Sequence, residues 1–400
     1  MTHTTRAGAH PLLYFDHAAS APRRPEVIEA MAPFTCGVVG NPTGSHRAAR
    51  AARLALDDAR EEVAALTGSL PGGVVFTGGG TEAANLAVFG VAADRARRGR
   101  PARLCVSAIE HHAVLDSAQW LASHEAAEVC WLPVDKTGLL SPDTLRTAIA
   151  PDPGSVAMIS VMWANNEVGT IQPIAELASV AHEHQIPFHT DAVQAAGQVP
   201  VNFAASGADG LTITGHKIGG PVGAGALLLG RGIEPVPVMH GGGQERDVRS
   251  GTLDAPAIAA FAVAAQIAVK RRDEESVRLA ALRDELIERV TTAVPDAILN
   301  GAPPGPGRLP GNAHFSFPGC EGDALLMLLD AKGIACSTGS ACTSGVAQPS
   351  HVLLAMGADE ARARGSLRFS LGSTSTEADV EALGAAIGEV VERARRANKS

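Results

Sequence analysis

The sequence predicts an α/β protein, with one large domain built on a mostly parallel sheet between helices and a smaller α+β domain. Short apolar runs alternate with helical segments, as in parallel sheets that are buried on both faces. The 400 residues exceed what one hydrophobic core usually organises. The pattern also changes after residues 300–312, whose prolines and glycines predict irregular structure.

The expected elements follow in chain order. A helix at 47–66 should end at Gly68, and a helix at 83–96 should follow the first strand. Candidate strands lie at 73–76, 103–107, 129–134, 156–161, 186–189 and 211–214. A long helix at about 255–290 would bridge to the smaller unit, with strands at 312–317 and 366–371 and helices at 321–332 and 376–395. We expect a large domain at 16–258 and a small domain formed by 1–15 and 259–400.

Composition narrows the classes of function. Hydrophobic residues at 46% and charged residues at 19% indicate a globular protein. The net charge of −9 provides no global basic field for nucleic acid or anionic lipid, so we expect neither partner. The longest apolar stretch, 257–269, is shorter than the roughly 20 residues of a membrane span. Scattered cysteines and a start without a signal-peptide pattern favour a reducing cytoplasm.

A metal site is not expected. The six cysteines lack paired metal spacing. His182 and His184 are two positions apart on a helical run, so they point to different faces.

A glycine-rich turn, Gly78-Gly79-Gly80, lies between an expected strand and an expected helix. Free amides and the positive end of the helix dipole would meet there, which suits a phosphate group. The hydroxyl group of Thr81 could add a hydrogen bond. A plain tight turn also explains this sequence, which is neither a Walker A loop nor a GxGxxG motif.

Two further polar residues end neighbouring strands. Asp191 follows an apolar strand, where a buried carboxylate is costly unless it meets a cation; alone, it is more simply a helix cap. Lys217 follows the next strand; alone, it is more simply a surface lysine in a turn. Together with the glycine turn, they provide an amine, an acid and an anion cup, which an aldehyde cofactor with a ring nitrogen and a phosphate requires.

Cys342 lies among small, turn-prone residues at 337–345. Such a segment has little apolar surface to bury, so we expect a mobile loop at about 333–348. The loop would carry the thiol between an interior site and an outside partner. The remaining cysteines are expected to pack as small apolar side chains.

The chain resembles the cysteine desulfurases, pyridoxal phosphate enzymes of the class V aminotransferase group, and in particular their long-loop, NifS- and IscS-like branch. The resemblance covers nearly the whole chain and is carried by Glu110-His111-His112-Ala113-Val114, Asn165-Asn166-Glu167-Val168-Gly169, Arg249-Ser250-Gly251-Thr252 and the segment around Ser340-Ala341-Cys342. It departs from the commonest pattern at Gly78-Gly79-Gly80 and at Thr214-Gly215. It implies fold type I of the pyridoxal phosphate enzymes, with a mostly parallel, seven-stranded-type sheet.

The resemblance also implies roles for individual residues. Lys217 would be the Schiff-base lysine, Cys342 the sulfur acceptor, and His111 a catalytic imidazole that stacks on the cofactor ring. Cofactor contacts would come from Gly80, Thr81, His111, Asn166, Asp191, Gln194, Thr214, His216 and Lys217. Thr252 would reach the cofactor of the partner subunit in a homodimer. Asn41, Asn166 and Arg368 would bind the substrate.

The implied reaction removes sulfur from L-cysteine, giving L-alanine and a persulfide on Cys342. The sulfur would pass to an acceptor protein, either an iron-sulfur scaffold or a thiolation enzyme. Two alternatives remain open. The first is an aminotransferase or lyase of the same fold, which would have no use for a thiol at position 342. A non-catalytic sulfur-relay or assembly scaffold would retain the fold without turnover.

Overall fold

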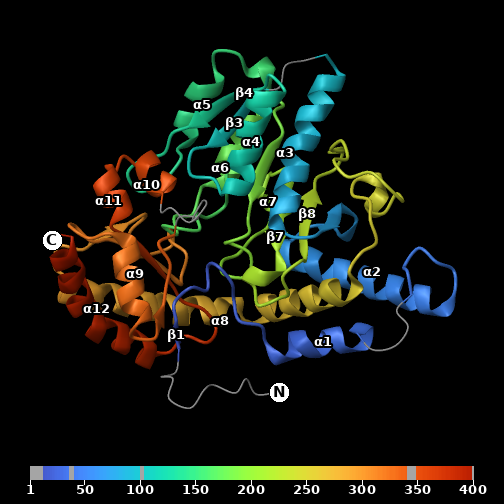
Figure 1. The fold of residues 1–400 in the computed structure, drawn as a ribbon. Helices are drawn as coiled ribbons and strands as arrows, with labels where there is room; N and C mark the ends of the chain where they lie inside the picture. Colours follow the sequence, from blue (N-terminus) through green and yellow to red (C-terminus); the bar gives the residue numbers. More distant parts are fainter. Residues whose placement is uncertain (1–11, 36–39, 100–102, 340–347, 399–400) are drawn as a thin grey trace.

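The computed structural model describes residues 12–35, 40–99, 103–339 and 348–398. Its centre is a seven-stranded sheet with the order β2-β8-β7-β6-β5-β3-β4 (Figure 1). The strands are β2 (Val74–Thr77), β3 (Arg103–Ser107), β4 (Glu128–Leu132), β5 (Val156–Ser160), β6 (Phe188–Asp191), β7 (Gly210–Thr214) and β8 (Gly225–Leu229). Neighbours from β4 to β7 pair in parallel, whereas β8 is antiparallel to both β7 and β2. The predicted α/β fold with a mostly parallel sheet is confirmed.

Helices cover both faces of this sheet, which explains its nearly continuous apolar strands. On one face, Leu104 and Val106 of β3 pack in a buried cluster with α3 (Gly80–Arg97) and α4 (His112–His124). Cys105, which lies between them, belongs to the opposite cluster. That cluster contains α2 (Arg47–Thr67), α5 (Pro142–Ile149) and α6 (Ile174–His182). Side chains that alternate along a strand therefore all meet apolar partners.

A second core lies around a smaller antiparallel sheet with the order β12-β10-β9. Its strands are β9 (Ile298–Asn300), β10 (Asn312–Ser316) and β12 (Ser366–Ser370), and its main helices are α9 (Gly322–Asp330) and α12 (Glu377–Ala397). Beside it, β1 (Leu13–Tyr14) pairs in parallel with β11 (Ile334–Ala335). Phe15, directly after β1, is buried in this second core.

The long helix α8 (Ala255–Ala293) joins the two cores. It begins at Asp254, whose carboxylate accepts a hydrogen bond from the amide of Ala257. Phe261 in its first half packs in the core of the large sheet, and Leu286 in its second half packs in the core of the small sheet. Figure 1 shows α8 across the lower part of the molecule, above α1 and between α2 and α12. The predicted bridging helix is present, three residues longer at its end than expected.

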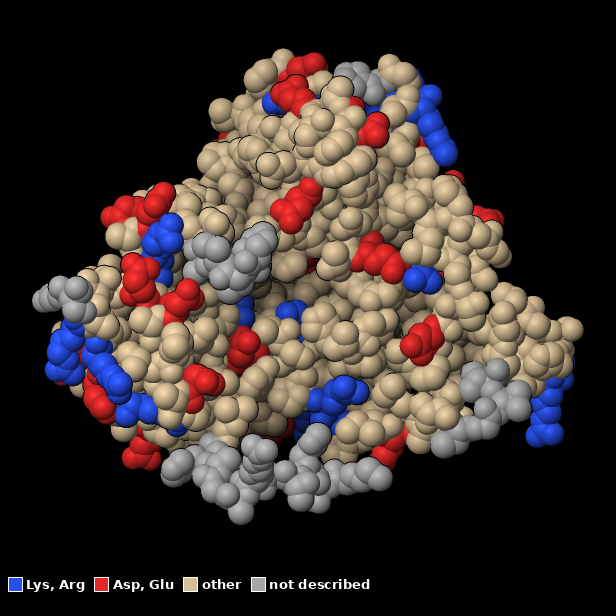
Figure 2. All heavy atoms as spheres, viewed as in Figure 1, with Lys and Arg blue, Asp and Glu red and all other residues tan. Residues whose placement is uncertain are grey.

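The remaining helices are short or peripheral: α1 (Pro25–Thr35), α7 (Phe203–Ser206), α10 (His351–Ala355) and α11 (Glu360–Arg364). No helix in the described part of the chain is long and apolar enough to cross a membrane. On the face drawn in Figure 2, the basic side chains are interspersed with acidic ones, and most of the surface carries neither.

Candidate active site

A cavity of about 870 Å³ lies where the strands of the large sheet end and the small sheet begins. The segments that follow β2, β3, β5, β6 and β7 all reach it, as expected where the carboxyl ends of parallel strands meet. Ten of the predicted site residues line it: Gly80, Thr81, His111, Asn166, Asp191, Gln194, Thr214, His216, Lys217 and Arg368.

Lys217 ends the short helical turn η3 (Gly215–Lys217) after β7 and is half-buried. Its Nζ atom donates hydrogen bonds to the carbonyl oxygens of Ala18 and, at 2.8 Å, of Ala19. Burial and the nearby charge of Arg368 lower its pKa to about 8, although Asp16 and Asp191 act in the opposite direction. A neutral amine, the form that reacts with an aldehyde, is therefore accessible near physiological pH.

Asp191 ends β6 and is buried. Its Oδ1 atom accepts a hydrogen bond of 2.8 Å from the amide of Val193. Burial raises its pKa to about 6, and this effect outweighs the hydrogen bond and the charge of Lys217. Little in the surrounding protein compensates the negative charge of this buried carboxylate, so a cationic partner in the cavity would stabilise it. A protonated pyridine nitrogen is such a partner.

His111 caps the start of α4, because its Nδ1 atom accepts a hydrogen bond from the amide of Ala113 at 3.1 Å. The surrounding protein removes water from the ring, and this desolvation, followed by the charge of Lys217, lowers its pKa to about 4. The ring is therefore neutral at pH 7. With Nδ1 as an acceptor, the proton lies on Nε2, where it can be donated.

The turn before α3 has the properties of a phosphate cradle. Gly79 adopts a φ of 148°, and a Cβ atom on Gly80 would lie 3.1 Å from Val193 Cγ2, so glycine allows the close backbone approach here. The N-terminus of the 18-residue helix α3 opens at this point. Thr214 adds a hydroxyl group, 3.0 Å from Nδ1 of His216. The donors and their helix dipole fit a phosphate group.

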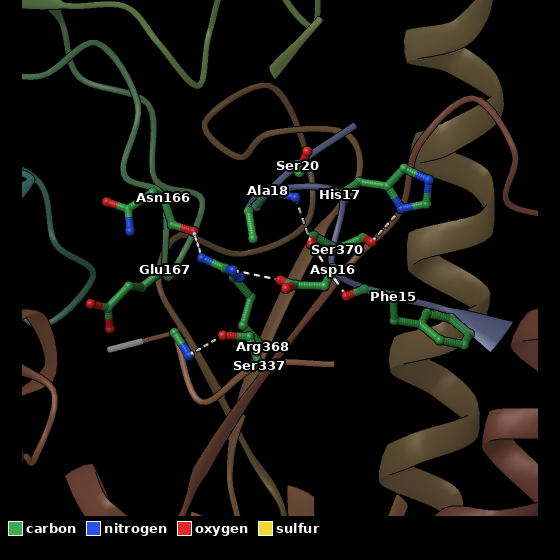
Figure 3. Close-up of polar contacts among 12 residues, drawn as sticks. Phe15, Asp16, His17, Ala18, Ser20, Asn166, Glu167, Ser337, Arg368 and Ser370 are labelled. Atoms are coloured by element: carbon green, nitrogen blue, oxygen red, sulfur yellow. Dashed lines mark hydrogen bonds and ion pairs between the residues drawn. The ribbon is translucent and has the colours of Figure 1, made fainter. Parts of the chain in front are cut away.

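Arg368 lies on β12, at the side of the cavity formed by the small sheet (Figure 3). Its Nη1 atom donates to the carbonyl oxygen of Asn166 at 2.9 Å, and its Nη2 atom donates to Oδ1 of Asp16 at 2.7 Å. The Nε atom is buried and has no hydrogen-bond partner among the described residues. The guanidinium group is thus fixed, with donors still available for an anion.

Three predicted site residues are not brought into this cavity. Asn41 is exposed, and its Oδ1 atom accepts a hydrogen bond from the hydroxyl group of Thr43 at 2.9 Å. Thr252 is also exposed and does not line the cavity. Cys342 and half of its expected mobile loop, residues 340–347, lie outside the described residues. Gly339 and His351, on either side of the undescribed segment 340–347, both line the cavity.

Other residues in or next to the cavity were not predicted to act there. Glu110 is fully buried, and burial, followed by the negative charge of Asp191, raises its pKa well above the usual range. It belongs to the motif that contains His111, which could have pointed to it. Asp16 pairs with Arg368 at 2.7 Å. No motif identified His351. The centroid of its ring lies 4.9 Å from the ring centroid of His112.

The fold and this cavity define a class of protein. A model of the aminotransferase class-V family matches residues 13–383, so the chain belongs to this family. Members of the family use pyridoxal phosphate, and the cavity residues described above fit that cofactor.

The comparisons also identify the branch. The "IscS-like cysteine desulfurase" of Mycobacterium tuberculosis is 55% identical over 387 residues, which cover 96% of this chain and 98% of that protein. A solved "NIFS-LIKE PROTEIN" superposes with a TM-score of 0.87 at 32% identity, covering 96% of this chain and all of that one. The structure named "SspA in complex with cysteine" gives a TM-score of 0.77 at 34% identity and covers 90% of this chain and 98% of that one. Within the class-V aminotransferases, the chain belongs with the cysteine desulfurases, as its motifs predicted.

Proposed function

We propose that this protein removes the sulfur atom of L-cysteine, giving L-alanine and a persulfide on Cys342, with pyridoxal phosphate held at Lys217. The observation that favours this reaction over transamination is the position of Gly339 and His351. Both line the cavity, and they flank the segment that contains Cys342. Cys342 follows Gly339 by three residues (342 − 339), which span at most about 10 Å when extended, so the thiol can reach the cavity.

The cofactor, when bound, supplies an electron sink that makes the Cα proton of the substrate removable. In the proposal, Asp191 stabilises the positive charge of the ring nitrogen, and His111 stacks on the ring. The amides of the glycine turn bind the phosphate together with Thr81, Thr214 and His216. Asn166 and Gln194 contact the ring oxygen or the substrate.

Lys217 would serve as the base for the Cα proton. Its lowered pKa of about 8 supports this role, because a significant fraction of the amine is neutral near pH 7 to 8. To act, the amine must leave the carbonyl oxygens of Ala18 and Ala19. Those two bonds would hold the amine beside the cavity whenever it is not bound to the cofactor.

Cys342, as a thiolate, would attack the substrate sulfur. The bond between Cβ and sulfur breaks as the sulfur–sulfur bond forms. A proton takes the place of sulfur on Cβ, and the proton held by Lys217 returns to Cα, which gives alanine. The Nε2 proton of His111 is available for this transfer. Arg368 lines the cavity and would bind the substrate carboxylate through the N–H groups of Nη1 and Nη2 that Asn166 and Asp16 leave free. The role predicted for Asn41 in the same task stays a prediction.

The persulfide must leave the protein, so we also propose a sulfur-acceptor protein as partner, either an iron-sulfur scaffold or a thiolation enzyme. A homodimer, with Thr252 at the partner subunit's cofactor, would give that exposed residue a function. The cytoplasm is the compartment that would keep the reactive thiol reduced.

The test uses the purified protein with bound pyridoxal phosphate. Wild type should form alanine from L-cysteine and carry a persulfide, whereas Cys342→Ser should keep the cofactor absorbance and form no persulfide. A Cys320→Ser variant, which changes a buried cysteine of the second core, is the matched control. Undiminished sulfide and alanine release by Cys342→Ser would refute the proposal. A colourless protein whose spectrum does not respond to L-cysteine would favour the scaffold instead.

A further inference from the structure

One short segment contacts both cationic groups of the cavity. This N-terminal turn, residues 16–20, follows β1 and the buried Phe15. Its carbonyl groups at Ala18 and Ala19 accept hydrogen bonds from Lys217, and its carboxylate at Asp16 accepts one from Arg368. Figure 3 shows Asp16 beside the guanidinium group, with Asn166 on the other side.

The backbone of the turn is fixed on the small sheet. The carbonyl oxygen of Asp16 accepts hydrogen bonds from the amides of Ala19 and Ser20, at 3.0 and 3.3 Å, and from the hydroxyl group of Tyr14 at 3.1 Å. Asp16 also forms an isolated β-bridge with Ser370, two residues after Arg368 on β12. The carboxylate of Asp16 is therefore placed in register with the strand that carries Arg368.

The ion pair is unevenly buried. The Arg368 side chain is 5% exposed and that of Asp16 is 23% exposed. A guanidinium group has five N–H donors. One goes to Asp16, one goes to the carbonyl oxygen of Asn166, and the Nε donor has no partner among the described residues. Removing Asp16 would leave a buried cation without its counter-ion and free to turn about its side-chain bonds.

Asp16 also acts on the second cation. The positive charge of Arg368 lowers the pKa of Lys217, and the negative charge of Asp16 raises it. Asp16 and Arg368 together therefore lower the pKa of Lys217 less than Arg368 alone would.

We propose that Asp16 is a positioning residue for substrate recognition: it holds Arg368 in the orientation that binds the substrate carboxylate, and it offsets the charge of Arg368 at Lys217. This inference rests on the proposed function, since it takes L-cysteine as the substrate. It predicts a defect confined to substrates that carry a carboxylate, together with a changed pH dependence.

The test compares L-cysteine with L-cysteine methyl ester, which has the same amine and thiol but no carboxylate charge. Apparent dissociation constants come from the change in cofactor absorbance in the holoenzyme. Wild type should prefer the acid. In Asp16→Ala, binding of L-cysteine should weaken by about tenfold or more, whereas binding of the ester should change by less than about threefold.

Asp16→Asn tests the charge separately. Its side-chain oxygen can still accept the hydrogen bond from Arg368, so the protein should fold even if Asp16→Ala does not. It should keep most of the preference for the acid, because Arg368 keeps its orientation. The acidic limb of its pH–rate profile should move to lower pH, because Lys217 loses a negative neighbour.

The control is Asp296→Asn, which removes an ion pair of similar length with Arg395 at the surface. This variant should match wild type in its preference for the acid over the ester and in its pH–rate profile. Equal weakening of acid and ester by the Asp16 variants would show a merely structural role and overturn the proposal. An unchanged pH–rate profile in Asp16→Asn would overturn it as well. Failure of the wild type itself to act on L-cysteine would instead refute the proposed function.

Discussion

The Nζ atom of Lys217 donates a hydrogen bond of 2.8 Å to the carbonyl oxygen of Ala19, which lies 198 positions earlier in the chain. The N-terminal turn therefore holds the amine that we assign to the cofactor. Two opposing effects meet at this amine. The carbonyl oxygens favour its charged form, whereas burial and Arg368 favour the neutral form and lower its pKa to about 8.

This balance predicts how cofactor capture depends on pH. Only the neutral amine attacks an aldehyde, so the rate at which cofactor-free protein binds pyridoxal phosphate covalently should rise through about pH 8 and then level off. An unperturbed lysine, with a pKa of 10.5, would show the rise more than two units higher. Stopped-flow absorbance at fixed ionic strength measures this rate. A rate that still increases steeply above pH 9.5 would contradict the assigned environment.

Replacing Lys217 should abolish covalent retention of the cofactor. After reduction with borohydride and denaturation, wild type should keep the cofactor on the peptide that contains residue 217, and Lys217→Gln should keep none. Lys332, which is on the surface and pairs with Glu389 at 2.8 Å, offers the control Lys332→Gln. Peptide mass spectrometry distinguishes these cases. Cofactor found on another lysine of wild type would disprove the role of Lys217.

Asp191 should lower the stability of the cofactor-free protein while it supports activity. Its pKa is about 6 in the folded protein against 3.8 unfolded, so folding takes up a proton in this range and stability falls as the pH rises from about 4 to 6. The cost above pH 6 is roughly 3 kcal/mol. Asp191→Asn, whose oxygen can still accept from Val193, should therefore stabilise the cofactor-free protein at pH 8 by about 1–3 kcal/mol.

The same substitution should reduce turnover by about a hundredfold or more, because the ring nitrogen loses its anionic partner. Urea unfolding of the cofactor-free protein and alanine release by the holoenzyme provide the two measurements. A variant that is less stable without cofactor, or fully active with it, would show that Asp191 is a structural cap.

The burial of His189 predicts that the folded protein loses stability in acid. It is buried, and its ring nitrogens lie 2.9 Å from the hydroxyl groups of Ser160 and Thr212. Burial lowers its pKa to about 4. Since the unfolded chain binds the proton at about pH 6.5, stability should fall as the pH drops below that value, by about 2 kcal/mol at pH 5 from this residue.

A titration of unfolding free energy from pH 7.5 to 5 tests this expectation. His189→Gln should be less stable than wild type at pH 7.5, because it loses packing and a hydrogen bond, but it should lose less stability on acidification. Parallel curves for the two proteins would show that His189 does not titrate as its burial implies.

Much of the fold could be predicted from local sequence. The strand β3 was expected at its observed bounds, and α2 ends at Gly68 in the left-handed conformation that glycine favours. Lys217 and Asp191 could be assigned to one site because polar residues at the ends of neighbouring parallel strands must lie together. These predictions needed only the periodicity of apolar residues and the rule that parallel strands end at the same edge of a sheet.

Other features depend on contacts that local patterns do not encode. The strand β8 was not predicted, because its sequence of Gly, Ala and three Leu contains no β-branched residue, and its antiparallel partners β2 and β7 determine its structure. The pair of Asp16 and Arg368 joins positions 352 residues apart, which no spacing rule could identify. The two-residue strands β1 and β11 depend on the same long-range packing.

Mass spectrometry of the holoenzyme after brief incubation with L-cysteine tests the assigned chemistry most directly. With thiols blocked before digestion, fragmentation of the peptides should place one additional sulfur atom on Cys342, and none on Cys36, Cys105, Cys130, Cys320 or Cys336. Alanine should form in the same sample. Alanine formation without added sulfur at Cys342, or added sulfur on a different cysteine, would contradict the mechanism.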